Sequence, residues 1–157
     1  MATEYASSAT DWAGSVLEVS DTGSPENWTA IAELTQITFG DMTTEAIDVT
    51  HLLSPNAHKE KIPGNRDTGA FGISGNWLPE NATQSNSSTA PGGLVYNGRT
   101  RTVKQFRIVL GNSGSPSTIW GFRGFISSFK PGDAANGTAK KFTAAITPSQ
   151  DVSAALP

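Results

Sequence analysis

Residues 48–54, with the sequence DVTHLLS, hold an acid, a base and a hydroxyl close together. Asp48, His51 and Ser54 are the residue types of a nucleophilic triad. A triad, however, takes its members from different parts of a fold and places backbone donors beside the nucleophile. The chain has no G-x-S-x-G turn that would present such a serine. We therefore expect no catalytic residue, and we interpret the segment as a turn whose Ser and Asp side chains bind backbone groups.

The patterns of metal and phosphate sites are also missing from the sequence. His51 and His58 are the only histidines, cysteine is absent, and no H-E-x-x-H motif occurs. The glycine-rich stretch 69–75, GAFGISG, lacks the lysine and the strand-to-helix context of a phosphate-binding loop. We therefore expect neither a metal nor an organic cofactor.

The densest positive cluster consists of Arg99, Arg101, Lys104 and Arg107. Such a cluster can contact phosphate groups. The formal charge of the whole chain is -3, however, and the spacing does not keep these side chains on one face of a strand. We interpret them as a solvated strand face, or as partners of acidic groups on a neighbouring subunit.

Length and composition predict one β-rich domain over residues 1–157. A chain of this length buries a core without disulfide staples, and 16 glycines and 9 prolines mark many turns. The lack of cysteine suits folding in a reducing cytoplasm, and the N-terminus has no apolar run typical of a secretory signal. The longest apolar stretches are a few residues, so no membrane partner is expected.

The elements that must position these side chains are mostly strands. Apolar alternation predicts strands over 14–20, 69–78, 102–110, 117–129 and 140–147, and a short strand starts at Ile47. Segment 28–39 mixes helical spacing with strand-forming residues, and we interpret it as one strand with a bulge. Pro91 suits the first turn of a short helix. Together these elements indicate a β-sandwich or partly open barrel with one short flanking helix.

Three segments are expected to lie outside this core. Residues 1–13 form an N-terminal arm, and residues 148–157 form a loose C-terminal tail. Residues 51–68 contain Pro55, Pro63 and Gly64 and show little periodicity, which predicts a long loop. Loops of this length inside a compact domain tend to be functional or to contact a partner.

The stretch 47–79, IDVTHLLSPNAHKEKIPGNRDTGAFGISGNWLP, resembles the pattern of the tail tube (major tail) proteins of long, non-contractile-tailed bacteriophages. In that pattern an I-D-V-T step precedes a Ser-Pro turn, a basic K-E-x-I-P-G run, and a strand that closes on G-N-W-x-P. The strand 122–129 and the P-G-D turn 131–133 also agree with it. The sequence departs from the pattern after Pro79, where TQSNSSTAPGG stands in place of an amphipathic helix.

The resemblance implies a structural subunit rather than an enzyme. Six copies would form a ring whose sheets join into one inner barrel. Stacked rings would then form the conduit for ejection of viral DNA into the host, with transient, non-specific passage of the double strand. The resemblance further implies contacts with the tape measure protein, the tail terminator and the distal tail protein. The protein would reside in the virion tail after synthesis in the host bacterial cytoplasm.

Within this resemblance, the 51–68 loop contacts neighbouring subunits or the next ring. The residues expected at that interface are His51, Ser54, Pro55, Lys59, Glu60, Ile62, Pro63, Gly64 and Asp67. A conduit must not hold its cargo, and DNA binding strengthens with each phosphate that a protein neutralises. Acidic residues are therefore expected to face the lumen, and Glu18 and Asp48 are the candidates.

Two alternative functions remain open. One is the tube protein of a related injection device, such as a gene transfer agent or a phage-like bacteriocin. The other is a carbohydrate-binding β-sandwich that uses Trp12, Trp28, Trp77 and Trp120 as stacking platforms. Trp77 and Trp120 lie in apolar alternation, which favours core packing. A tube protein should polymerise, whereas a sugar-binding module should stay monomeric.

Overall fold

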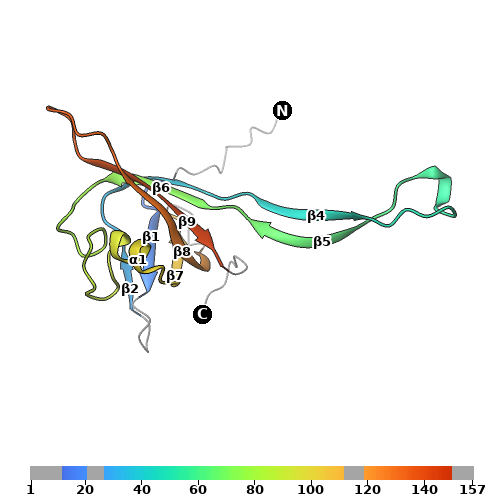
Figure 1. Ribbon diagram of the computed structural model, residues 1–157, viewed down its shortest axis with the longest axis horizontal. Helices are drawn as coiled ribbons and strands as arrows, with labels where there is room; N and C mark the ends of the chain where they lie inside the picture. Colours follow the sequence, from blue (N-terminus) through green and yellow to red (C-terminus); the bar gives the residue numbers. More distant parts are fainter. Residues whose placement is uncertain (1–11, 21–26, 112–118, 150–157) are drawn as a thin grey trace, which may run out of the picture.

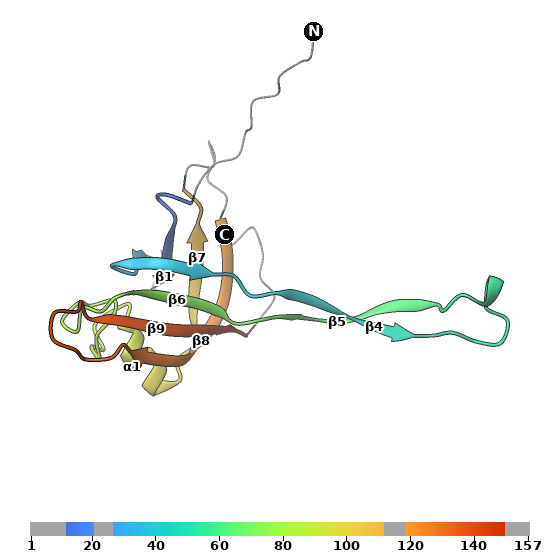
Figure 2. The same ribbon diagram turned by 90° about the horizontal axis from the view of Figure 1, so that it is seen from above.

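The computed structural model of the protein describes residues 12–20, 27–111 and 119–149. It consists of a curled sheet with one helix packed on it and a long two-stranded arm that leaves the sheet (Figures 1 and 2). The N-terminal arm expected over 1–13 and the tail expected over 148–157 lie largely outside the described residues.

The curled sheet is antiparallel and has seven strands in the order β2-β1-β7-β8-β9-β6-β3. The strands are β1 Val16–Ser20, β2 Trp28–Ala30, β3 Leu34–Thr38, β6 Phe71–Asn76, β7 Lys104–Val109, β8 Ile119–Pro131 and β9 Lys141–Pro148. The two edge strands, β2 and β3, are separated in the chain only by residues 31–33. The sheet therefore curls until its edges approach each other at one corner. This arrangement confirms the expected β-rich fold, a partly open barrel with one short helix.

The expected single strand over 28–39 is wrong, because the chain turns at residues 31–33. Glu33 adopts a φ of 57°, and the N–H of Ile31 donates to the carbonyl of Leu17 at 2.9 Å. A bulge is present nearby, where the register of β3 against β6 shifts between Leu34 and Gln36. Ile31, Leu34 and Ile37 all pack against the core. Ile31 lies in the turn, whereas Leu34 and Ile37 lie in β3. Their spacing of three residues therefore does not come from a helix.

The core lies inside the curl of the sheet and is built from alternate residues of each strand. Phe71 stacks on Phe122 with ring centroids 4.5 Å apart, and Phe106 also stacks on Phe122, with centroids 5.7 Å apart. A buried phenylalanine side chain contributes about 1.5–3 kcal/mol of transfer free energy. The outward-facing residues of these strands are more exposed, as the alternation in the sequence predicts.

A bulge in β8 changes the predicted facing of one aromatic side chain. The register of β8 against β9 shifts between Ile126 and Ser128, so Phe129 pairs with the inward-facing Ala144. Phe129 therefore stacks on Phe142, with centroids 5.4 Å apart, on the core side. Uninterrupted alternation over 117–129 would place Phe129 on the face opposite Ile126, but a bulge reverses the alternation beyond it.

The expected short helix is present as α1, Leu94–Thr100, which begins later than Pro91. Gly93 is the residue before the helix, and a Cβ there would lie 1.9 Å from the carbonyl oxygen of Ser85. Leu94 is buried, and Gly98 allows α1 to approach Ile126 of β8 closely. Within the described ranges, no helix is long and apolar enough to cross a membrane.

Candidate subunit interface

The arm consists of β4, Met42–Asp48, and β5, Lys61–Thr68, which form a two-stranded sheet with no third strand among the described residues. It extends far from the barrel along the long axis of the molecule (Figure 1). Every residue of β4 is exposed, as is most of β5. An isolated two-stranded hairpin is at best marginally stable in water. The arm is therefore the part of the molecule that most needs a partner surface.

The expectation of a continuous loop over 51–68 is wrong for residues 61–68, which form β5. The tip comprises residues 49–60 and includes a short 3-10 turn, Pro55–Ala57. Pro63 pairs with Ala46 in the strand, and the register shifts between Thr44 and Ala46. A bulge on a strand without a second neighbour accommodates proline and glycine. Pro63 and Gly64, which suggest a loop in the sequence, therefore mark a bulge within β5.

Two glycines determine where the arm leaves the sheet. The N–H of Gly69 donates to the carbonyl of Asp41 at 2.9 Å. A Cβ on Gly40 would lie only 2.0 Å from the carbonyl oxygen of Gly69. The two strands thus approach at this point more closely than a side chain permits, and this contact holds the root of the arm.

The carboxylate of Glu60 contacts two other side chains of the tip. Its Oε2 accepts a hydrogen bond from Ser54 Oγ at 2.7 Å, and the same oxygen lies 3.4 Å from His51 Nε2. The N–H of Leu53 donates to His51 Nδ1 at 3.1 Å. Because Nδ1 accepts, a neutral His51 carries its proton on Nε2, which faces Glu60. The tip is thus a folded turn rather than an irregular loop.

Side-chain bonds to the backbone complete this turn, as interpreted from the sequence. The N–H of Thr50 donates to Asp48 Oδ1 at 2.9 Å, and the N–H of His51 donates to Ser54 Oγ at 3.0 Å. Hydrogen bonds from the side chain and the backbone of Thr50 lower the pKa of the Asp48 carboxyl, and the charge of Lys61 adds a smaller effect. The hydroxyl of Ser54 both donates to Glu60 and accepts from the backbone of His51, so it helps to fold the turn.

The residues expected at an interface all belong to this arm. His51, Ser54, Pro55, Lys59 and Glu60 lie in the tip, and Ile62, Pro63, Gly64 and Asp67 lie in β5. Sequence reasoning missed the two residues that stand out most, Leu52 and Leu53, which are 104% and 86% exposed. A Leu-Leu pair inside a polar, turn-rich segment was the available signal.

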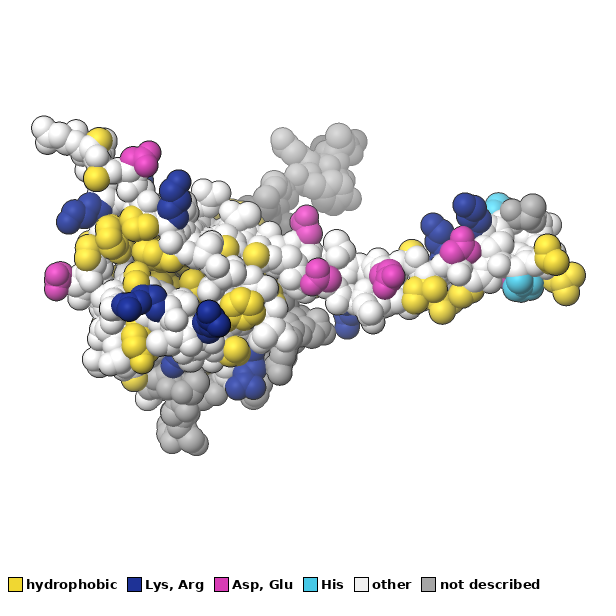
Figure 3. Space-filling view, viewed as in Figure 1, with side chains coloured by type: hydrophobic (Ala, Val, Ile, Leu, Met, Phe, Trp, Pro, Cys, Tyr) yellow, Lys and Arg dark blue, Asp and Glu magenta, His cyan; other side chains and the backbone are white. Residues whose placement is uncertain are grey.

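Other apolar residues of the arm share one side of it. Ile47 and Ile62 lie directly opposite each other in the ladder, and both are exposed. Figure 3 shows hydrophobic side chains gathered along one side of the arm and at its end. An apolar surface on a segment with no core of its own is typical of a protein contact.

The two acidic lumen candidates lie in different parts of the molecule. Glu18 belongs to β1 in the barrel and pairs with Arg107, whose guanidinium also lies 4.4 Å from the ring centroid of Trp28. Asp48 lies at the outer end of the arm. The acidic partner of Arg107 is therefore inside the same chain, whereas Arg99 and Arg101 are exposed at the end of α1.

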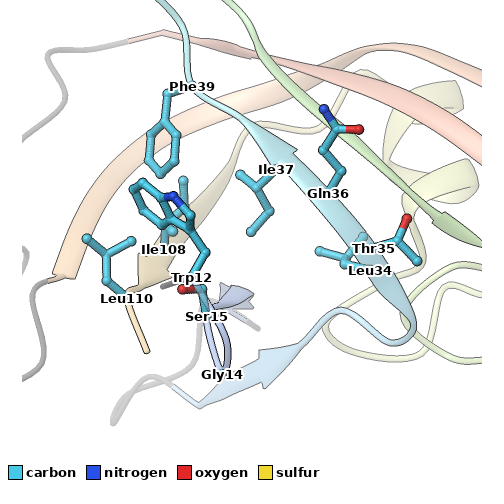
Figure 4. Close-up of a pocket in the computed structure, with 10 residues that line it drawn as sticks. All are labelled: Trp12, Gly14, Ser15, Leu34, Thr35, Gln36, Ile37, Phe39, Ile108 and Leu110. Carbon is cyan, nitrogen blue, oxygen red and sulfur yellow. The ribbon is translucent and has the colours of Figure 1, made fainter. Parts of the chain in front are cut away.

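A cavity of about 400 Å³ opens at the seam where the sheet fails to close. Figure 4 shows it between β3 and the neighbouring ends of β1 and β7. We call it the seam cavity; its apolar lining includes Trp12, Leu34, Ile37, Phe39 and Leu110. Trp12 is 66% exposed and tilts against Phe39 at a centroid distance of 5.6 Å.

The remaining tryptophans do not form a sugar-stacking platform. Trp77 and Trp120 pack against the core, as their alternation predicts, and Trp28 lies beneath Arg107. Among the described residues, no group of three His, Asp or Glu side chains could hold a metal ion.

Comparisons with known proteins agree with this geometry. The family model described as lambda phage tail tube protein matches residues 11–150. A chain from the virion of a native gene transfer agent particle has a TM-score of 0.65 at 16% identity, covering 92% of this chain and 98% of its own. A chain from the sheath/tube terminator of an extracellular contractile injection system has a TM-score of 0.64 at 12% identity, covering 96% and 97%. Among curated protein sequences, no match is found.

Proposed function

The chain belongs to the lambda phage tail tube protein family, and from this premise we propose that its copies assemble through the arm into stacked hexameric rings. The rings form a tube that conducts double-stranded DNA during ejection into the host. The single observation that carries this proposal is the arm, whose apolar side chains find no partner within the described part of its own chain.

The open sheet supports a ring in the same way. The outer edges of β2 and β3 have no strand partner among the described residues. Exposed strand edges are normally covered or paired, because their unsatisfied backbone groups recruit other strands. Joining sheets of neighbouring copies edge to edge removes these edges. The tail of an empty gene transfer agent particle, to which the fold is similar at a TM-score of 0.63, has C6 symmetry.

The arm provides the second contact that a tube requires. A head-to-tail contact that closes by rotation gives a ring, and a further axial contact gives a filament. An arm that projects from the barrel can reach past its own ring. Ile62 and the tip residues would then be buried against a neighbouring copy or the next ring, and this burial would stabilise a hairpin that is weak alone.

The lumen is proposed to be neutral to acidic, so that DNA slides without being held. Of the two candidate carboxylates, Asp48 has the better support. It is exposed, and no basic side chain pairs with it among the ion pairs of the described residues. Glu18 already pairs with Arg107, so its charge is largely compensated.

The wider partners of the proposed tube are a tape measure protein inside it, a terminator at one end and a distal tail protein at the other. The protein is not proposed to be an enzyme or to bind a cofactor. The tube of a gene transfer agent or a phage-like bacteriocin is the second candidate, favoured by the fold similarity to a gene transfer agent chain. The two candidate functions differ only in the particle to which the tube belongs.

Negative-stain electron microscopy with size-exclusion chromatography over a concentration series tests the assembly. We expect rings or hollow tubes with a central channel. The paired substitution Leu52→Asp and Leu53→Asp should abolish them while leaving the melting temperature of the monomer unchanged. Val103→Asp is the matched control, because Val103 is also an exposed apolar residue (46%) but lies outside the arm. A chain that stays monomeric at every concentration would contradict the proposal.

A further inference from the structure

We propose that Leu52 and Leu53 at the arm tip of one copy dock into the seam cavity of a second copy, beside Trp12 and Phe39. This inference rests on the proposed tube function and identifies the surface that receives the arm. The leucines of the tip contact no apolar surface in the described part of their own chain. Both leucines are almost fully exposed, and Figures 1 and 2 place the tip at the far end of the molecule from the barrel.

The seam cavity offers an apolar surface that suits these leucines. Large apolar side chains line it from several elements, including Leu34 and Ile37 of β3 and Leu110 after β7. These side chains pack against the core on one side but remain only partly buried. A volume of about 400 Å³ is within the range of sites that enclose an apolar ligand group.

The side chains of the tip, rather than its backbone, would enter the cavity. Leu52 and Leu53 lie in a turn in which the N–H of Ser54 donates to the carbonyl of His51 at 3.0 Å. The N–H groups of Thr50 and His51 are also bonded within the tip. The docking therefore leaves the outer edge of β3 available to the neighbouring sheet of the ring.

A second apolar hollow, between Trp77 and the β8–β9 connection, is the alternative receptor. Trp77 is the only large apolar side chain among the described residues of its lining; the others are small, polar or charged, among them Ala134, Ala135, Lys140 and Lys141. A leucine beside the lysines would remove part of the hydration of their ammonium groups. The seam cavity also has polar residues in its lining, but it brings several aromatic and branched apolar side chains together and can contact a leucine from more sides.

Because the leucines and the cavity lie on different surfaces, the contact is head-to-tail. Each copy offers one tip and one cavity, and every added copy presents a new free cavity. The contact therefore propagates, as a tube requires, rather than closing after two copies.

Engineered cysteines test this contact directly, because the chain has no native cysteine. One full-length variant carries Leu52→Cys and a second carries Gln36→Cys, an exposed position at the cavity. The two variants are mixed, assembled into tubes, oxidised, and separated on a non-reducing gel. We expect a covalent dimer from the mixture, and little from either variant alone. Leu52→Cys mixed with Thr143→Cys, at an exposed position on β9, is the matched control.

Each outcome bears on a different claim. A dimer with Gln36→Cys but not with Thr143→Cys supports docking in the seam cavity. Leu52→Cys is also mixed with an Ala135→Cys variant, whose position lines the hollow beside Trp77. A dimer from that mixture, and none with Gln36→Cys, would overturn the inference. Tubes that form without either cross-link would overturn it as well, while leaving the tube function intact. Unmodified protein that forms no tubes would overturn both.

Discussion

The side-chain amide of Gln84 donates to the carbonyl oxygen of Ala32 at 2.6 Å, across 52 positions of sequence. The same Nε2 donates to the carbonyl of Asn76 at 3.1 Å, and Oε1 accepts from the N–H of Leu78 at 2.7 Å. Gln84 is completely buried. One side chain thus joins the turn between the sheet edges, the end of β6 and the loop before α1.

Gln84→Ala should lower the free energy of unfolding by about 3 kcal/mol or more. The substitution leaves buried backbone groups without partners, and each such group costs about 1–3 kcal/mol. Urea unfolding followed by tryptophan fluorescence measures the loss. Gln36→Ala, an exposed glutamine on β3, should stay within about 0.5 kcal/mol of the unmodified protein. Equal losses for the two variants would show that the buried bonds of Gln84 contribute nothing.

Gly75→Ala should destabilise the β3–β6 pair, whereas Gly72→Ala on the same strand should not. A Cβ on Gly75 would lie 2.3 Å from the carbonyl oxygen of Glu33, so backbone must move. Such overpacking costs about 1–3 kcal/mol. A Cβ on Gly72 would meet Thr38 Cβ at 3.4 Å, which is an ordinary contact. Thermal denaturation of both variants compares them, and a stable Gly75→Ala protein would contradict the close approach.

The arm tip should loosen as the pH falls through the pKa of Asp48. The carboxyl has a lower pKa in the folded tip than its usual 3.8, chiefly because Thr50 donates hydrogen bonds to it. A group with a lowered folded pKa stabilises the fold above its unfolded pKa, and that contribution is lost on acidification. The tip is therefore fully held at neutral pH and weakens below about 3.8.

Thr50→Val should raise the pKa of Asp48 toward its usual value. The substitution removes the side-chain hydrogen bond of Thr50, which lowers that pKa more than the backbone hydrogen bond does. A carbon-detected NMR titration of the Asp48 carboxyl measures the change. Thr43→Val, also on the arm, provides the control, since Thr43 bonds only the carbonyl of Asp67 among the contacts seen. An Asp48 pKa that does not move in Thr50→Val would refute this origin of the shift.

Arg107 and Glu18 should show a coupling of about 1 kcal/mol in a double-mutant cycle with alanine. The two side chains are only 27% and 18% exposed, so solvent screens their attraction incompletely. Arg107→Lys should lose part of the stability as well, because a lysine ammonium lacks the planar guanidinium that lies over the Trp28 ring. A coupling free energy of zero would show that the ion pair contributes no more than a contact at the exposed surface.

Local sequence was sufficient wherever one strand could be interpreted by itself. The alternation in β6, β7 and β9 predicted both the strands and the inward-facing residues, because side chains of a strand alternate between its two faces. The turn at 48–54 was also predictable, since the Asp and Ser side chains bind backbone only a few residues away. Residues 47–79 likewise carried the family pattern that the matching family model covers.

The tertiary structure decided what depends on pairing between distant segments. Nothing within 28–39 indicates that its two halves join opposite edges of the sheet, because β1 and β6 select those positions. Register shifts placed Phe129 in the core and let Pro63 lie within a strand, since a bulge is defined only relative to a partner strand. The exposure of Leu52 and Leu53 was likewise decided by the tertiary structure, because β4 and β5 carry these residues away from the barrel. Whether an apolar residue is buried depends on the length and direction of the strands that carry it, and these arise only when the whole chain folds.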